Sequence, residues 1–338
     1  SRNPETVFAS IEDDCIRRDL TINALYYNIS TGEIVDMVGG LNDIENKVIR
    51  TTNENPDIVF DDDPLRVLRV VRFATRYGWD IESKTYESMK RYVDRLDIIS
   101  KERIKDEFNK ILLSDNATMG IRTLCDIGAM KYIIPEVDEM IGLEQNAYHF
   151  GDVFEHTMAL LDYDTKHFES EDITVRLALL LHDIGKIVTK SVGDDGRVHF
   201  YDHEFAGATM VVDILKRLKY DNKTIDTVQF LVKNHMRTKN FGNDCSKIKT
   251  KSFNKLAYDC KNVYLYKSLA RVIDCDNNSH KAEHNITGQY DYFVNHMDDA
   301  VKMFGYKLPV DGNDVMEVLN ISGGVLVKKV LDRLMNRT

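Results

Sequence analysis

Apolar residues recur along most of the chain at the three- and four-residue spacing of amphipathic α-helices. Leu68, Val71 and Phe73 alternate with arginines, and a similar pattern runs from Ile99 to Leu113. The denser apolar run from Leu177 to Leu181 predicts a helix that is buried on all sides. Because the 338 residues contain only five prolines, we predict a mainly α-helical chain, large enough for roughly two or three hydrophobic cores.

The buried helix predicted at Leu177–Leu181 ends in His182 and Asp183. An imidazole and a carboxylate at one point can both bind a divalent cation. Other imidazoles and carboxylates occur at about one per predicted helix, before and after this pair: His156, His203, His235 and Asp276. Asp274 is the competing candidate for the position of Asp276. Each alone is typical of a packed or capping residue. The ordered set predicts a site for Mg, Mn, Fe, Co, Ni or Zn.

This set resembles the HD phosphohydrolase superfamily, in its His-Asp-Ile-Gly subgroup, over about residues 150 to 285. The resemblance implies metal ligands at His156, His182, Asp183 and Asp276, and a second metal or a phosphate at His203 and His235. It implies phosphoester hydrolysis, since such a cation lowers the pKa of bound water and neutralises phosphate oxygens. Lys186 is placed to add a catalytic positive charge near that phosphate, and an exposed lysine at a helix end is the alternative.

A second group of motifs lies near the N-terminus. Arg17, Arg18 and Asp19 come first, and Asp61-Asp62-Asp63-Pro64 follows, with Arg66 and Arg69 beyond. Pro64 predicts the start of a helix, and the acidic triplet would favour the positive end of its dipole. In such a helix Asp63 and Arg66 are one turn apart and project from the same face. A carboxylate beside a guanidinium complements the amino group and ring nitrogen of cytosine and adenine, whereas guanine and uracil present the opposite polarity.

Together these motifs resemble the tRNA nucleotidyltransferase (CCA-adding enzyme) and bacterial poly(A) polymerase family. The resemblance implies that Asp63 and Arg66 read the incoming CTP or ATP without a template, and that the tRNA 3′ end is a partner. It implies that Arg17, Arg18 and Asp19 contact the nucleotide sugar and phosphates, with Arg69 as a further cation for the triphosphate. Asp36, Gly39 and Gly40 resemble the family's flexible turn between head and neck, with a plain hairpin turn as the alternative.

One departure from the family concerns its catalytic head. Members begin with a Gly-Gly-x-Val-Arg-Asp segment and a strand bearing Asp-x-Asp, whose carboxylates bind the two Mg ions of nucleotidyl transfer. Nothing of that kind precedes Arg17, and the Asp-x-Asp sequences at 162–164 and 274–276 lack the glycine-serine loop. We therefore expect the transfer step to need a separate or truncated N-terminal head.

The expected layout has four parts: a small α/β nucleotidyltransferase head remnant (1–50), a helical neck that binds nucleotide and RNA (51–140), an all-helical HD phosphohydrolase domain (141–285) and a short helical tail (286–338). The neck motif at Ile99–Phe108 and the tail motif at Leu308–Met316 resemble members in which an HD domain is inserted between neck and tail.

Charge and cysteine usage limit the partners and the compartment. The formal net charge of −10 argues mildly against a nucleic-acid partner, so RNA would need the local basic segments 233–239, 247–255 and 328–333. Five scattered cysteines, an odd number, suit reduced thiols in the cytoplasm. The sequence shows no apolar stretch of bilayer length and no signal peptide, so we expect no membrane partner.

Three functions remain open. The first is the body of a CCA-adding enzyme whose HD domain removes 2′,3′-cyclic or terminal phosphates. The second is a stand-alone HD phosphohydrolase of nucleotides, and the third is an RNA-binding module without turnover. The base-reading pair favours the first, since a phosphatase has no need of Arg66. The sequence does not separate CCA addition from A-only or poly(A) addition, nor does it fix the metal, the phosphorylated substrate or the oligomeric state.

Overall fold

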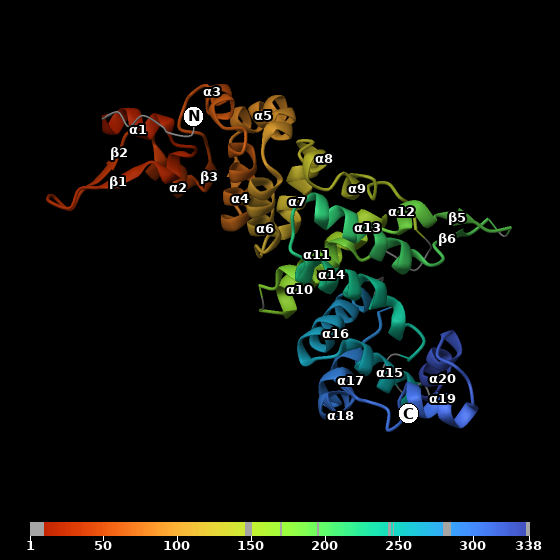
Figure 1. Cartoon of the computed structure of the whole chain (residues 1–338). Helices are drawn as coiled ribbons and strands as arrows, with labels where there is room; N and C mark the ends of the chain where they lie inside the picture. The colour runs from red at the N-terminus through yellow and green to blue at the C-terminus, as the bar shows by residue number, and fades with distance from the viewer. Residues whose placement is uncertain are drawn as a thin grey trace.

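Helices dominate the computed structural model, which confirms the mainly α-helical fold class (Figure 1). The structure describes residues 10–145, 151–169, 171–194, 196–242, 245, 247–279 and 285–335. The chain runs from an N-terminal unit at the upper left of Figure 1, through the neck and the histidine-rich region, to a helical tail at the lower right. None of the described helices combines the length and apolar character needed to cross a bilayer.

The N-terminal unit contains short helices and short strands. Its elements are α1 (Ile11–Arg17), η1 (Thr21–Asn23), β1 (Leu25–Tyr27), β2 (Ile34–Asp36), α2 (Gly40–Asn46) and β3 (Val48–Ile49). Strands β1 and β2 pair antiparallel, whereas β3 pairs in parallel with β4 (Asp80–Ile81) of the neck. The parallel pair crosses the boundary expected at residue 50, so the N-terminal unit and the neck are joined by backbone hydrogen bonds.

The sequence between β2 and α2 forms a cap for α2. The Asp36 carboxylate accepts hydrogen bonds from the backbone N–H groups of residues 38 to 41, at 2.8 to 3.1 Å. Gly39 has a φ of +81°, which favours glycine. Gly40 packs so closely on the carbonyl of Thr21 that a Cβ would clash with it. The motif is therefore a helix cap held against η1.

The neck is a group of packed helices. It comprises α3 (Pro56–Asp62), α4 (Arg66–Tyr77), α5 (Ser83–Tyr92), η2 (Val93–Ile98), α6 (Lys101–Leu112), α7 (Ala117–Asp126), α8 (Met130–Ile133) and α9 (Pro135–Asp138).

The helix predicted from Pro64 begins two residues later, at Arg66, after a turn over residues 64 and 65. Asn55 caps an earlier helix, α3, through the N–H of Asp57, and Pro56 occupies its first turn. Asp61 and Asp62 therefore end α3 instead of capping α4. Asp63 is extended and accepts the N–H of Leu65 at 3.1 Å, and α4 begins only at Arg66.

The histidine-rich region is helical apart from one short hairpin. Its elements are α10 (Val153–His167), α11 (Ile173–Leu181), α12 (Lys186–Thr189), β5 (Ser191–Val192), β6 (Val198–His199), α13 (His203–Arg217), α14 (Asn222–Asn234), η3 (His235–Thr238), α15 (Thr250–Cys260) and α16 (Val263–Asn277). The antiparallel β5–β6 hairpin departs from the all-helical expectation. It forms around a turn in which the N–H of Gly196 donates to the carbonyl of Gly193. The tail contains α17 (Gln289–Asn295), α18 (Met297–Met303), α19 (Gly312–Leu319) and α20 (Val325–Met335).

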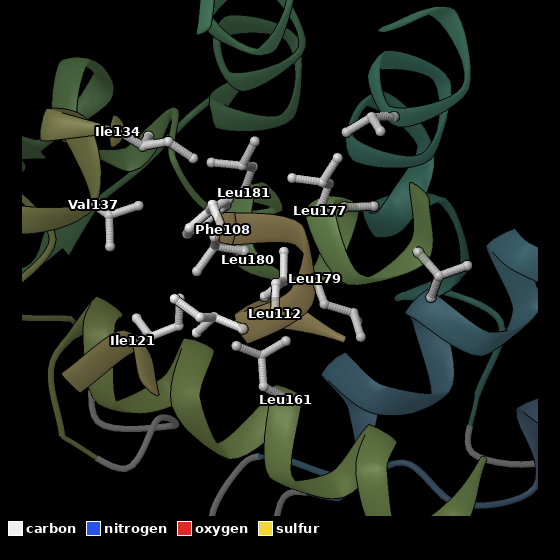
Figure 2. Packing of buried hydrophobic residues seen from close by; sticks show 14 of the residues in the cluster. Phe108, Leu112, Ile121, Ile134, Val137, Leu161, Leu177, Leu179, Leu180 and Leu181 are labelled. Atoms are coloured by element: carbon white, nitrogen blue, oxygen red, sulfur yellow. The ribbon is translucent and has the colours of Figure 1, made fainter. Parts of the chain in front are cut away.

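One continuous hydrophobic core joins the neck to the histidine-rich region. Helix α11 lies at its centre, and all of its residues from Val175 to Leu181 are buried. Figure 2 shows Leu180 and Leu181 of α11 close to Phe108 of α6, with Ile121 and Val137 of the neck around them. Burial of such side chains stabilises the contact by about 25 cal/mol per Å² of apolar surface. The two regions therefore pack as one body.

Candidate metal centre and nucleotide pocket

Three histidines of the candidate metal centre lie where helices begin or end, and a backbone carbonyl orients each ring. His182 follows the last residue of α11, and its Nδ1 lies 2.8 Å from the carbonyl oxygen of Leu179. The equivalent pairs are His203 with Phe200 at 2.8 Å and His235 with Val232 at 2.7 Å. Because a carbonyl only accepts, each Nδ1 carries the proton. Each Nε2 then holds the lone pair that a metal ion accepts.

The buried Asp183 carboxylate lies among these rings. Its Oδ2 is 3.1 Å from Nε2 of His182 and 3.9 Å from Nε2 of His156. Its Oδ1 is 3.2 Å from Nε2 of His203 and 3.8 Å from Nε2 of His235. The two oxygens of Asp183 face different pairs of imidazoles, so this carboxylate could bridge two cations.

Helix α16 contributes the second carboxylate of the cluster. The Oδ1 atom of Asp276 lies 3.2 Å from Nε2 of His156, which in turn lies in the first turn of α10. Asp274 faces elsewhere and accepts hydrogen bonds from the Tyr163 hydroxyl at 3.2 Å and the Asn278 amide at 3.0 Å. Of the two acids that the sequence left open, Asp276 is the one beside the histidines.

A glycine allows the metal-centre segments to approach one another. Gly185 follows the His-Asp pair, and a Cβ there would clash with the backbone of His203 and Gly207 in α13. The turn after α11 and the start of α13 therefore touch backbone to backbone. This contact brings His203 within reach of Asp183, which explains why the motif needs glycine at this position.

The side chains fit a pair of divalent cations. The Nε2 atoms of His182, His203 and His235 are buried, and none of them makes a hydrogen bond with the described residues. Buried polar atoms are rarely left without a partner. The donor atoms form two groups within ligand distance, His156–His182–Asp276 and Asp183–His203–His235. Imidazole and carboxylate donors suit Mn, Fe, Co, Ni, Zn or Mg.

The two carboxylates are held in the charged form. Burial raises the pKa of Asp183, but the nearby His182 and Lys186 outweigh it and hold the pKa well below its usual range. For Asp276, Lys239 and His156 likewise outweigh burial and lower the pKa well below its usual range. Burial lowers the pKa of His235 to about 3. Charged carboxylates and neutral imidazoles are the forms that bind metal ions.

Each carboxylate also has a lysine partner. Nζ of Lys186 lies 2.6 Å from Asp183 Oδ2 and donates to the side-chain oxygen of Gln145 over 2.6 Å. Nζ of Lys239 lies 2.7 Å from Asp276 Oδ2. The sequence analysis placed Lys239 only in the basic segment 233–239, although its position four residues after His235 was a usable signal for the metal centre. Lys186 is buried, not an exposed lysine at a helix end.

A second site lies between the N-terminal unit and the neck. All six residues expected to bind the nucleotide line one pocket of about 690 Å³, and these are Arg17, Arg18, Asp19, Asp63, Arg66 and Arg69. Asn23, Leu65, Phe73 and Arg103 complete its lining. The pocket thus joins the segment after α1 to the α3–α4 turn and to the start of α6. Its five arginines against two aspartates make it a strongly basic cavity.

Asp63 and Arg66 both line this pocket, and each is held by different hydrogen-bond partners. Oδ2 of Asp63 accepts a hydrogen bond of 2.8 Å from Arg103, which the sequence did not single out as a site residue. Arg66 donates to the carbonyls of Arg17 at 2.6 Å and Val59 at 3.2 Å. These contacts fix the carboxylate and the guanidinium in separate orientations on one wall.

A further ion pair lies in the lining of the pocket. Arg69 contacts Asp19 Oδ2 at 2.6 Å, and the amide of Asn23 donates to Asp19 Oδ1 at 3.2 Å. The Asp19 side chain is thereby held by both oxygens, while Arg18 pairs with Asp14 at 3.0 Å on the outer side.

Comparison with known proteins assigns the family. Three family patterns match the chain in succession: "Poly A polymerase head domain" at residues 1–50, "Probable RNA and SrmB- binding site of polymerase A" at 78–141, and "HD domain" at 146–274. The chain therefore belongs to the tRNA nucleotidyltransferase and poly(A) polymerase family and carries an HD domain.

Individual relatives agree with this assignment. The chain is 37% identical to the "Multifunctional CCA protein" of Acinetobacter baumannii strain AYE over 235 residues, which is 68% of this chain and 55% of that protein. It is 35% identical over 233 residues to the "A-adding tRNA nucleotidyltransferase" of Deinococcus radiodurans, covering 67% of this chain and 53% of that protein. The chain thus spans about half the length of the curated relatives it matches.

Solved structures support the same fold. The CCA-adding enzyme of Bacillus stearothermophilus, solved in complex with CTP, aligns with a TM-score of 0.69 at 21% identity, over 98% of this chain and 70% of that one. The Thermotoga maritima CCA-adding enzyme complexed with tRNA aligns with a TM-score of 0.52 at 19% identity, over 97% of this chain and 69% of that one.

Proposed function

We propose that the chain is the nucleotide-selecting and RNA-holding body of a tRNA nucleotidyltransferase. The observation that carries this proposal is the basic pocket between the N-terminal unit and the neck, in which all six residues expected to contact CTP or ATP meet. A triphosphate needs several cations around its oxygens, and Arg17, Arg18 and Arg69 of this pocket would supply them. We assign nucleotide selection to residues 51–140 and binding of the tRNA 3′ end to the neck and the regions that follow it.

Base selection would follow from the polarity of one wall of this pocket. The Asp63 carboxylate accepts from an exocyclic amino group, and the Arg66 guanidinium donates to the adjacent ring nitrogen. Cytosine and adenine present this combination, whereas uracil and guanine present the reverse. The partners Arg103 and Arg17 hold these two side chains, so the wall is preorganised for one polarity.

Equilibrium binding of the four nucleoside triphosphates to the wild-type chain tests this proposal. CTP and ATP should bind at least about tenfold more tightly than UTP and GTP. This ratio corresponds to the loss of about one hydrogen bond when two donors or two acceptors face each other. Equal affinity for all four nucleotides would overturn the assignment of base selection to this pocket.

The HD domain, residues 141–285, would serve as a phosphoesterase for 2′,3′-cyclic or terminal phosphates. His156, His182 and Asp276 would hold one cation, and Asp183, His203 and His235 a second. Such a cation lowers the pKa of a bound water and offsets the charge on phosphate oxygens. Lys186 would place an ammonium group beside Asp183 for the substrate phosphate, and its partner Gln145 would orient it.

The packing of the HD domain argues against a stand-alone phosphohydrolase. Its central helix α11 packs on the neck through a shared core, and Arg122 of the neck makes a two-pronged ion pair with Glu155 at 2.7 Å. The buried Nε2 atoms without hydrogen-bond partners in the described regions argue against an RNA-binding module that lacks turnover. The combined enzyme is therefore favoured over both alternatives.

We place the protein in the cytoplasm, because all five cysteines are free thiols.

A further inference from the structure

A second pocket, far from the neck, has the character of a site for a flat aromatic ring. It measures about 500 Å³ and is lined by residues of the segment before α15, of α15 itself and of the helices α17 and α18. We call it the aromatic pocket and define it by Ile248, Thr250, Phe253, Tyr292, His296 and Asp299. Its volume falls within the range of ordinary ligand sites.

Aromatic rings form one side of this pocket. The rings of Tyr292 and His296 are stacked, with centroids 3.9 Å apart and planes inclined by 19°. Phe253 meets both edge-on, at 5.9 Å from Tyr292 and 6.0 Å from His296. Nδ1 of His296 lies 2.9 Å from the carbonyl oxygen of Tyr292, so Nδ1 donates and Nε2 is an acceptor. Aromatic rings beside hydrogen-bonding groups form the kind of surface to which unpaired nucleobases bind.

Exposed lysines flank the aromatic pocket. Ile248 and Thr250 line it, and Lys247, Lys249 and Lys251 alternate with them along the chain. All three lysines are exposed, and none pairs with an acid in the described part of the chain. The aromatic pocket therefore offers rings for a base and lysine ammonium groups for phosphates. This combination suits a nucleic-acid strand better than an isolated base, because only the strand carries several phosphates.

The position of the aromatic pocket suggests what binds there. Its helices α17 and α18 lie at the opposite end of the molecule from α3 and α4, which carry the nucleotide pocket (Figure 1). A single nucleotide cannot reach both ends, whereas an RNA with its 3′ end at the neck can. Building on the proposed function, we propose that the aromatic pocket holds an unpaired base of the bound tRNA and that Lys247, Lys249 and Lys251 contact its backbone.

Binding of a labelled tRNA transcript, followed over a range of salt concentrations, tests this. Tyr292→Leu, which removes the ring and leaves a smaller apolar side chain, should weaken binding about tenfold, within the range of base–aromatic stacking. The double variant Lys249→Ala with Lys251→Ala changes only surface charge. It should lower the slope of log affinity against log salt by roughly 0.7 per lysine.

Matched controls separate this site from general effects. Tyr264→Leu removes a half-exposed tyrosine elsewhere on the domain, and Lys223→Ala removes an exposed lysine of α14. Both controls should bind tRNA as the wild type does. Wild-type affinity and salt slope in the lysine double variant would overturn the proposal even if Tyr292→Leu failed to fold.

Photo-crosslinking of wild-type protein to tRNA that carries 4-thiouridine gives an independent readout. We expect crosslinked peptides that contain Tyr292 or Phe253, and crosslinks confined to other segments would overturn the pocket assignment. If the wild-type chain binds neither tRNA nor CTP, the proposed function fails along with the pocket. If it binds both and the pocket variants change nothing, the pocket proposal fails alone.

Discussion

Arg103 at the start of α6 donates a 2.8 Å hydrogen bond to the carboxylate of Asp63 at the end of α3. Both side chains line the proposed nucleotide pocket and are partly exposed, Arg103 at 51% and Asp63 at 32%. An arginine that holds an acceptor in place limits the orientations in which that acceptor can read a base. This contact places the start of α6 in the lining of the proposed nucleotide pocket.

Loss of Arg103 should therefore reduce nucleotide discrimination. Arg103→Ala frees the Asp63 carboxylate to rotate, so the preference for CTP and ATP over UTP and GTP should fall about three- to tenfold, the loss of roughly one charge-assisted hydrogen bond. Competition binding of the four triphosphates measures this ratio. Arg95→Ala is a matched control, because Arg95 pairs with Asp61 of α3, and neither residue lines the pocket. The interpretation fails if both variants change the ratio equally.

Metal content should follow the two groups of donor atoms. The wild-type chain should hold two divalent cations, since the donors form two sets. Asp183→Ala should lose both, because its oxygens face both pairs of imidazoles, whereas His203→Ala should lose one. Elemental analysis of protein dialysed against each metal gives the ratio. His167→Ala, an exposed histidine of α10, should keep both ions, and an Asp183 variant with full metal content would contradict the bridging role.

A core substitution in the HD domain should also destabilise the neck. Leu180 is fully buried against neck residues, so Leu180→Ala should lower the free energy of unfolding by about 3 kcal/mol. Trp79, the single tryptophan, reports on the neck by fluorescence, and circular dichroism reports on all helices. Both denaturation curves should shift together. Val188→Ala, a 63% exposed position of α12, should shift neither. A Trp79 transition unmoved by Leu180→Ala would show that the regions unfold separately.

The Asp36 cap should give a pH-dependent contribution to stability. Burial opposes ionisation, but four backbone N–H groups outweigh it and lower the pKa of Asp36. Since its pKa is lower when folded than when unfolded, the carboxylate stabilises the fold above about pH 4, and this contribution disappears as the pH falls through the folded pKa. Asp36→Ala should cost about 1 kcal/mol at pH 7 and less at a pH below about 4. Denaturation at both pH values measures the difference, and an equal cost at both would refute a charged cap.

The sequence predicted the helical fold class and most of the side chains that meet in the metal cluster and in the pocket. Both predictions rest on signals within short stretches of sequence. Helical periodicity is visible in the residue pattern, and the His-Asp pair marks the end of a buried helix. The ligand choice between Asp274 and Asp276 needed coordinates, since it depends on which face of α16 meets α10. The pairing of Lys239 with Asp276 depends likewise on tertiary packing.

The other differences between the predicted and the observed structure also have local or tertiary causes. Pro64 was expected to start a helix with the acidic triplet before it, but Asn55 and Pro56 start a separate helix, α3, which takes up Asp61 and Asp62, and α4 begins two residues after Pro64. The two-residue strands β3 and β4 are too short for a periodic signal, so their pairing across the expected boundary was invisible. The Asp63–Arg103 contact joins residues 40 positions apart and has no local signature.

The most direct test of the account measures two activities in the same pair of variants. Asp63→Ala should weaken the binding of CTP and ATP while hydrolysis of a 2′,3′-cyclic nucleotide with added divalent metal stays at the wild-type rate. Asp183→Ala should abolish that hydrolysis and leave the binding of CTP and ATP unchanged. Variants that lose both activities together, while remaining folded by circular dichroism, would contradict the claim that base selection and phosphoester hydrolysis use separate sites.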